Sequence, residues 1–70
     1  MSGINQRIAD YVAGTDTPHK VYAARFGVSP GVFSNILRGK RRIMSDEVVK
    51  LAEALGVSVG YLLGEDDQTA

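Results

Sequence analysis

The sequence contains no cysteine and no long apolar run. Without cysteine, neither disulfides nor thiolate-bound zinc can support the fold, so the core must come from the packing of apolar side chains alone. No apolar stretch approaches the roughly 18 residues that cross a bilayer, and the start "MSGINQRIAD" lacks the basic and apolar regions of a signal peptide. A chain of 70 residues has room for one domain but not for a large enzyme cleft. We therefore expect one small cytoplasmic domain with no membrane partner.

Acidic residues are missing from the middle of the chain. The formal net charge is zero, yet residues 17–45 hold six cations and no Asp or Glu. Residues 46–70 hold six acids and only one cation, Lys50. A basic centre between acidic ends indicates one surface suited to a polyanion and another surface kept away from it.

Apolar residues recur at helical spacing and predict an all-α domain, because no strand pattern or internal repeat competes with this period. The first helix is expected to begin at Ile4 and to end near Gly14. Thr17 is expected to cap the second helix, with Pro18 at its first position. Gly27 is expected to end that helix, since glycine adopts the left-handed conformation without steric cost.

Three further helices are predicted after Gly27. Ser29 is expected to cap the third, with Pro30 at its first helical position, and Gly39 to end it. Ser45 is expected to cap the fourth helix and Ser58 a short fifth helix.

The domain is predicted to cover residues 1–64, followed by an acidic and flexible tail over residues 65–70. Its core is expected to draw on the apolar stripes of the first four helices, through Ile4, Ile8, Tyr11, Val12, Val21, Tyr22, Ala23, Phe26, Phe33, Ile36, Val48, Leu51, Ala52 and Leu55. The fifth helix carries Tyr61, Leu62 and Leu63.

Five residues of the second and third helices have the spacing of a helix-turn-helix. Two helices joined by a short turn at a steep angle need a small residue where they cross, here Ala23, and a glycine in the turn, here Gly27. They also need apolar residues after the turn and on the inner face of the second helix, here Val28, Phe33 and Ile36. The pattern predicts a helix-turn-helix, although other helical hairpins share parts of it.

Over residues 4–64 the sequence resembles the lambda-repressor-like helix-turn-helix domains of the Cro and phage-repressor (XRE) type. "NILRGKRR" is similar to the end of that family's recognition helix and its basic loop, and "VVKLAEALGVSVGYLLG" to its last two helices. The resemblance implies a five-helix domain that binds double-stranded DNA with its third helix in the major groove. It implies a phage-type or bacterial repressor that binds a palindromic operator as a homodimer, with no enzymatic activity and no cofactor, metal or small-molecule ligand.

The resemblance also assigns base contacts to the front of the third helix. Pro30 and Gly31 have no side chain that can form a hydrogen bond there, so direct readout is left to Asn35 and Ser34, with apolar contact from Val32. Specificity is then expected to depend partly on DNA shape.

The cations are suited to phosphate. His19, where the family often has Gln, and Lys20 fall in the first turn of the second helix, whose exposed N–H groups also favour anions. With about five phosphates neutralised, the logarithm of affinity should fall with the logarithm of salt at a slope of about −4 to −5. The expected phosphate contacts are His19, Lys20, Ser29, Arg38, Lys40, Arg41 and Arg42.

Other interpretations stay open at this point. A run such as "GKRR" is by itself usually a solvated loop, and a single histidine suggests neither a metal site nor an activated serine. A protein-binding module on the same fold is the main alternative, since the net charge is zero and the surface at residues 30–32 is apolar. Tyr61, Leu62 and Leu63 either form a dimer contact or close the core, and Leu37 is expected to pack on Ile43 or Met44 if it is not exposed.

Overall fold

The computed structural model describes residues 3–65, which form five α-helices and no strand. The all-α prediction is therefore confirmed. The predicted tail, apart from Glu65, lies outside the described residues. No helix among residues 3–65 is long and apolar enough to cross a membrane. The elements are α1 (Ile4–Ala13), α2 (His19–Phe26), α3 (Pro30–Leu37), the 3-10 turn η1 (Ser45–Glu47), α4 (Val48–Leu55) and α5 (Val59–Leu62).

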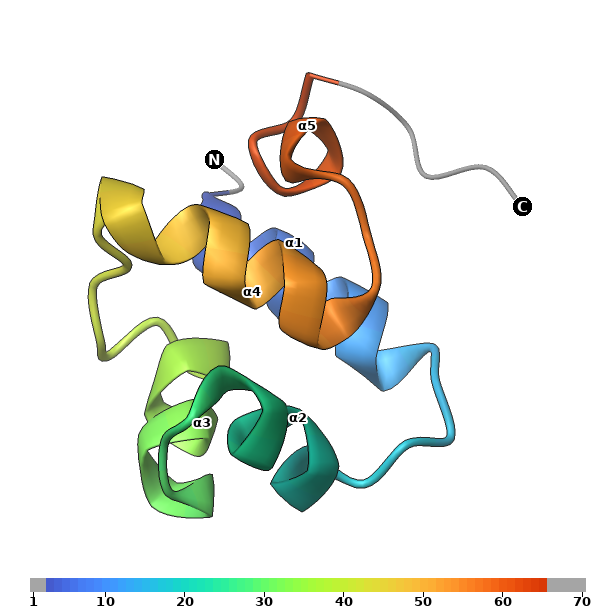
Figure 1. Cartoon of the computed structure of the whole chain (residues 1–70), viewed down its shortest axis with the longest axis vertical. Coiled ribbons are helices and arrows are strands. Elements are labelled where there is room, and N and C mark those ends of the chain that lie inside the picture. The colour runs from blue at the N-terminus through green and yellow to red at the C-terminus, as the bar shows by residue number, and fades with distance from the viewer. Residues whose placement is uncertain (1–2, 66–70) are drawn as a thin grey trace.

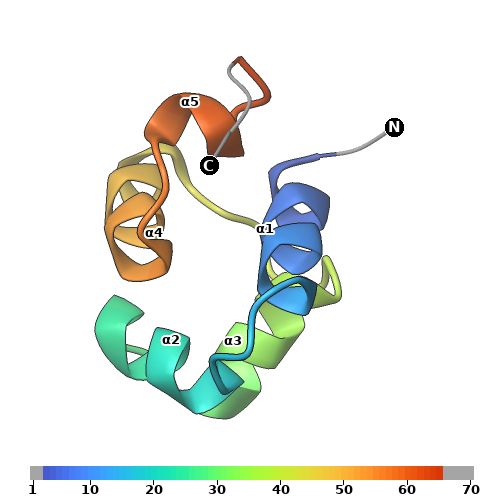
Figure 2. The same ribbon diagram turned by 90° about the vertical axis from the view of Figure 1, so that its right-hand side faces the viewer.

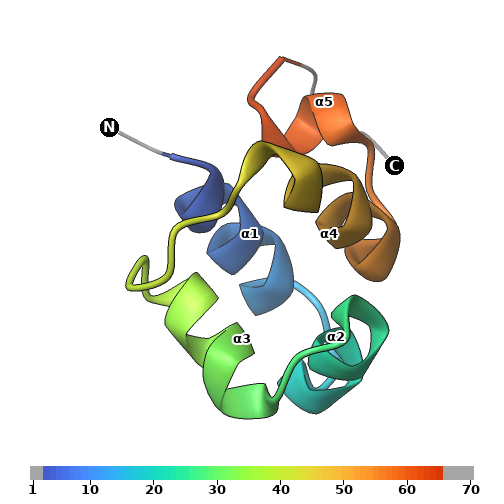
Figure 3. The same ribbon diagram turned by 60° about the vertical axis from the view of Figure 1, so that its left-hand side comes forward.

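The helices enclose one core. The helices α1 and α4 lie in the middle of the molecule, with α2 and α3 at one end and α5 at the other (Figure 1). A quarter turn of the view shows α4 on one side, α1 on the other, and the α2–α3 pair across one end between them (Figure 2). The segment that links α3 to α4 passes beside α1 on its way from the end of α3 to the start of α4 (Figure 3).

Every helix contributes side chains to this core, as the apolar spacing predicts for the first four. Phe33, Ile36, Ile8, Leu51 and Leu62 are the largest fully buried side chains. The half-buried residues Leu37 and Ile43 both pack against the core, whereas Met44 is largely exposed. The remaining core residues are Val12, Tyr22, Ala23, Phe26, Ala52, Ala54 and Leu55.

The turn between α2 and α3 has the predicted geometry. Gly27 has φ 90°, and the N–H groups of Gly27 and Val28 both donate to Ala23 O, at 2.8 and 2.9 Å. Ser29 then caps α3, because its Oγ accepts from the N–H of Val32 at 3.2 Å, with Pro30 as the first helical residue. This turn fixes how α3 is held against α2.

Two predicted helix starts and one predicted end are wrong by one or two residues. Thr17 does not cap α2, because Pro18 has the extended backbone (ψ 146°) of the N-cap residue and the helix begins at His19. Ser45 does not cap α4, because it is the first residue of η1, whose N-cap position is Met44. The helix α3 ends at Leu37 and not at Gly39.

Candidate nucleic-acid interface

The helix α3 has one buried and one exposed face. Phe33 and Ile36 have no exposed surface. Gly31, Asn35 and Arg38 follow one another at spacings of four and three residues and are all exposed. Such spacing places them on one side of the helix, away from the core. The structure therefore brings Gly31, Asn35 and Arg38 together on a surface that can lie against a partner.

The other predicted base contacts are less accessible or lie at the helix start. Pro30 is exposed, whereas Val32 and Ser34 are each half-buried. The Oγ of Ser29 already accepts a hydrogen bond as the helix cap. Its contact with a phosphate would therefore be a hydrogen bond that its O–H donates. Among the predicted base contacts on α3, Asn35 is thus the exposed side chain that has both donor and acceptor groups.

The N-terminus of α2 lies beside α3. The rings of His19 and Phe33 are arranged edge to face with their centroids 6.2 Å apart. His19 and Lys20 are both exposed and are the first two residues of α2. This position agrees with the predicted first turn, although the cap lies one residue later than expected.

Three exposed cations follow α3. Arg38 is the C-cap residue of α3, and Lys40 and Arg42 belong to residues 39–42, which we call the basic loop. Gly39 turns the chain with φ 75°, after which the N–H of Lys40 donates to Asn35 O at 2.9 Å. Within residues 3–65, no acidic side chain pairs with any of these three cations.

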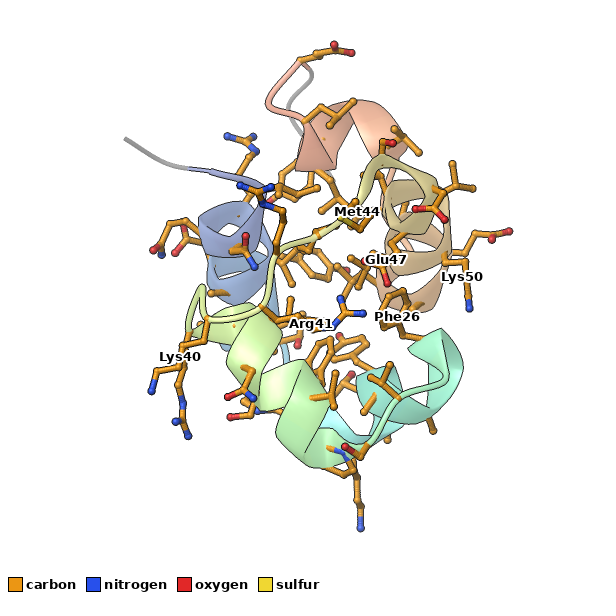
Figure 4. The ribbon with its side chains drawn as sticks, turned by 90° about the vertical axis from the view of Figure 1, so that its left-hand side faces the viewer. Phe26, Lys40, Arg41, Met44, Glu47 and Lys50 are labelled. Carbon is orange, nitrogen blue, oxygen red and sulfur yellow. The ribbon has the colours of Figure 1, made fainter. Side chains whose placement is uncertain are left out.

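Arg41 differs from its neighbours, because its guanidinium is bound to Glu47. Nη2 donates to Oε2 at 2.8 Å and Nη1 to Oε1 at 3.1 Å, so the pair is bidentate. The two side chains are 33% and 22% exposed. In Figure 4 Arg41 points inward toward Glu47 while Lys40 points outward from the loop. The predicted phosphate contact of Arg41 therefore competes with an existing intramolecular partner.

The pair shifts the titration of both groups. The hydrogen bonds from Arg41 lower the pKa of Glu47 to about 2, and the N–H of Met44, which donates to Oε1 at 3.0 Å, adds to this effect. The hydrogen bonds to Glu47 raise the pKa of Arg41. Both groups are thus charged at neutral pH, and the pair joins the basic loop to the start of α4.

Two exposed cations outside the basic loop make contacts between α2 and α4 or within α2. Arg25 reaches Ala54 O at 3.5 Å and lies over the ring of Tyr22 at 5.9 Å. The Nζ of Lys50 lies 5.5 Å from the centre of the Phe26 ring. Of the six cations in residues 17–45, four are exposed and have no intramolecular partner in the described part of the chain: Lys20, Arg38, Lys40 and Arg42.

One residue of this region was not expected from the sequence. The Nδ2 of Asn5, on α1, donates to Ile36 O at 2.9 Å and to Arg41 O at 3.0 Å. Its two acceptors are main-chain carbonyl groups, which every residue has, so no sequence pattern reveals them.

The predicted dimer residues have different environments. Leu62 has no exposed surface and closes the core, while Leu63 is 51% exposed. Tyr61 is half-buried between Tyr11, whose ring centroid is 6.0 Å away, and Arg7, which lies 5.0 Å from its ring. Of these three residues, only Leu63 therefore offers a large apolar surface to a partner. No group of three His, Asp or Glu side chains able to hold a metal ion occurs in residues 3–65.

Comparison with known proteins agrees with this geometry. The family model described as Helix-turn-helix matches residues 19–62, more than half of the chain. The chain therefore belongs to the helix-turn-helix family, and the resemblance to lambda-repressor-like domains is confirmed. No curated protein sequence matches the chain.

Two solved structures show the same fold. The restriction-modification controller protein C.AhdI from Aeromonas hydrophila is 22% identical, with a TM-score of 0.74, over 86% of this chain and 87% of that one. The P22 c2 repressor protein, solved in complex with synthetic operator 9T, is 23% identical, with a TM-score of 0.76, over 94% of this chain and 100% of that one. Identities at this level show a shared fold, and function is argued from the site.

Proposed function

We propose that this protein is a repressor that binds double-stranded operator DNA, with α3 in the major groove. The observation that carries the proposal is the position of the unpaired cations. Lys20 lies at the start of α2, and Arg38, Lys40 and Arg42 lie at and beyond the end of α3. The major groove of B-DNA is wide enough to admit a helix such as α3, and cations near both ends of that helix can then reach phosphates. Repression then requires only that the operator is occupied.

The experiment that tests this function is a salt titration with random-sequence duplex DNA. Four phosphate contacts give an expected slope of about −3.6, because each contact contributes about 0.9. Failure to bind any duplex at low salt would refute DNA binding. Selection of bound sites from a random duplex pool then supplies the operator sequence, its symmetry and its half-site spacing.

Asn35 is proposed as the main base reader, since an amide can pair with adenine through two hydrogen bonds. The variant Asn35→Ala should lose about 1 to 3 kcal/mol of preference at one base position and keep its affinity for random duplexes. The matched control is Gln6→Ala, which removes an exposed amide from α1. Unchanged base preference in Asn35→Ala would show that Asn35 does not read the sequence.

A dimer on a palindromic operator is proposed as the bound state. It would place two copies of α3 about 34 Å apart, with half-sites about ten base pairs apart. The P22 c2 repressor, which has this fold, was solved on an operator. Leu63 is the proposed contact, so Leu63→Glu should weaken dimerisation in sedimentation experiments without loss of helix content.

The family and the fold are those of DNA-binding regulators, which are not enzymes. The protein-binding alternative is not favoured by these relationships. We also propose that the protein acts in the cytoplasm, where it is bound to the nucleoid.

A further inference from the structure

The loop that carries Lys40 and Arg42 is held from outside the helix-turn-helix. Asn5 lies on α1, outside residues 19–62 that the family model matches. Its two acceptors, at Ile36 and Arg41, are 31 and 36 residues away in the sequence. One carbonyl belongs to the last turn of α3 and the other to the basic loop. A single amide group therefore connects both segments to α1.

Arg41 is restrained on its other sides as well. Its N–H donates to Asn35 O at 3.3 Å, and its guanidinium is bound to Glu47. Because Arg41 lies between Lys40 and Arg42 in the chain, restraint of its main chain also limits where these two exposed side chains begin. The loop is thus arranged before any DNA is bound.

We propose that Asn5 is a positioning residue for DNA binding, which holds the basic loop in the shape that presents Lys40 and Arg42 to phosphates. This inference rests on the proposed DNA-binding function. If Asn5 is removed, the loop must become ordered when DNA binds, and the lost conformational entropy lowers the affinity. The loss should be the same for every DNA sequence, because phosphates carry no sequence information.

The first test measures binding of Asn5→Ala to a random-sequence duplex. We expect affinity about fivefold to tenfold below wild type, the equivalent of one or two net hydrogen bonds. Gln6→Ala is the matched control, because Gln6 is on the same helix and donates only to the exposed Asp10, at 2.8 Å. Asn5→Leu is the second variant, since leucine keeps the number and branching of the side-chain heavy atoms and removes both N–H donors. Wild-type affinity in both Asn5 variants would overturn the inference.

A double-mutant cycle separates positioning from a general loss of stability. In a background of Lys40→Ala with Arg42→Ala, the loop has no exposed cation to place, so adding Asn5→Ala should change affinity less than about twofold. A reduced folded fraction would instead lower affinity equally in both backgrounds. Equal losses in the two backgrounds would therefore overturn the inference.

Hydrogen exchange tests the restraint in the absence of DNA. The amide hydrogens of Lys40 and Arg41, both bonded to Asn35 O, should exchange faster in Asn5→Ala, while those in α4 keep their rates. Unchanged exchange of both amides would overturn the inference. If the wild-type protein binds no duplex, the proposed DNA-binding function is refuted. If wild type and Asn5→Ala bind equally well, the function stands and only the role of Asn5 is refuted.

Discussion

The adjacent residues Arg41 and Arg42 should respond in different ways to the same substitution. Arg42 is exposed and unpaired, whereas Arg41 is bound to Glu47 at 2.8 Å. Four exposed cations give an expected salt slope of about −3.6, and Arg42→Ala should reduce it to about −2.7. If the two binding curves converge near 1 M salt, this change corresponds to about an eightfold loss of affinity near 0.1 M.

Arg41→Ala should leave the slope near −3.6, because its guanidinium is occupied by a carboxylate in the folded protein. It should instead lower the free energy of unfolding by about 1 kcal/mol or less, as expected for a partly exposed ion pair. The assay is fluorescence anisotropy with a labelled random-sequence duplex at several salt concentrations, together with urea unfolding of each variant. An equal flattening of the slope in both variants would show that Arg41 leaves Glu47 for a phosphate, and the assignment of Arg41 to the pair would then be refuted for the complex.

Three further predictions concern stability. Glu47→Gln should lower the free energy of unfolding by about 1 kcal/mol or less at pH 7. The pKa of Glu47 in the folded protein is lowered to about 2, from an ordinary value of 4.5. The stability that the ionised carboxylate contributes is therefore fully present above pH 4.5 and is lost as the pH falls toward 2. At that pH, urea unfolding should no longer distinguish the variant from wild type. Gly31→Ala should raise the free energy of unfolding by about 0.5 to 1 kcal/mol, because the added Cβ meets only Ser29 Oγ, at 3.9 Å; a loss of stability in thermal unfolding would contradict this. Leu62→Ala should cost about 2 to 5 kcal/mol and Leu63→Ala less than about 0.5 kcal/mol, and similar urea midpoints for the two would show that Leu62 is not a core residue.

The helices could be predicted because their apolar residues repeat at the helical period. Glycine ends α2 as expected, since Gly27 has positive φ, and Gly56 ends α4 with the same conformation. The starts were less accurate. Pro18 fits both the N-cap and the first helical position by its φ of −60°, and only its ψ, set by the packing of α2, decides between them.

The sequence predicts which residues belong to the candidate site, but it does not predict which of them form ion pairs or hydrogen bonds with one another. The sequence places cations near α3, yet it does not show which of them has an acidic partner in the fold. Arg41 and Glu47 are six residues apart and meet only because η1 turns the chain back toward the basic loop. Asn5 could not be found from sequence at all, because its acceptors are main-chain carbonyl groups of distant residues.

The start of α3 has a consequence for how operator choice can change. Gly31 is exposed, its backbone is outside the left-handed region, and a Cβ there would meet no atom closer than 3.9 Å. A glutamine or arginine at this position would add a polar side chain to the exposed face of α3, which we propose lies in the major groove, while the core and the basic loop stay as they are. If α3 reads DNA as proposed, a single substitution at Gly31 can change the preferred operator, which makes Gly31 the first position to vary in a redesign of specificity.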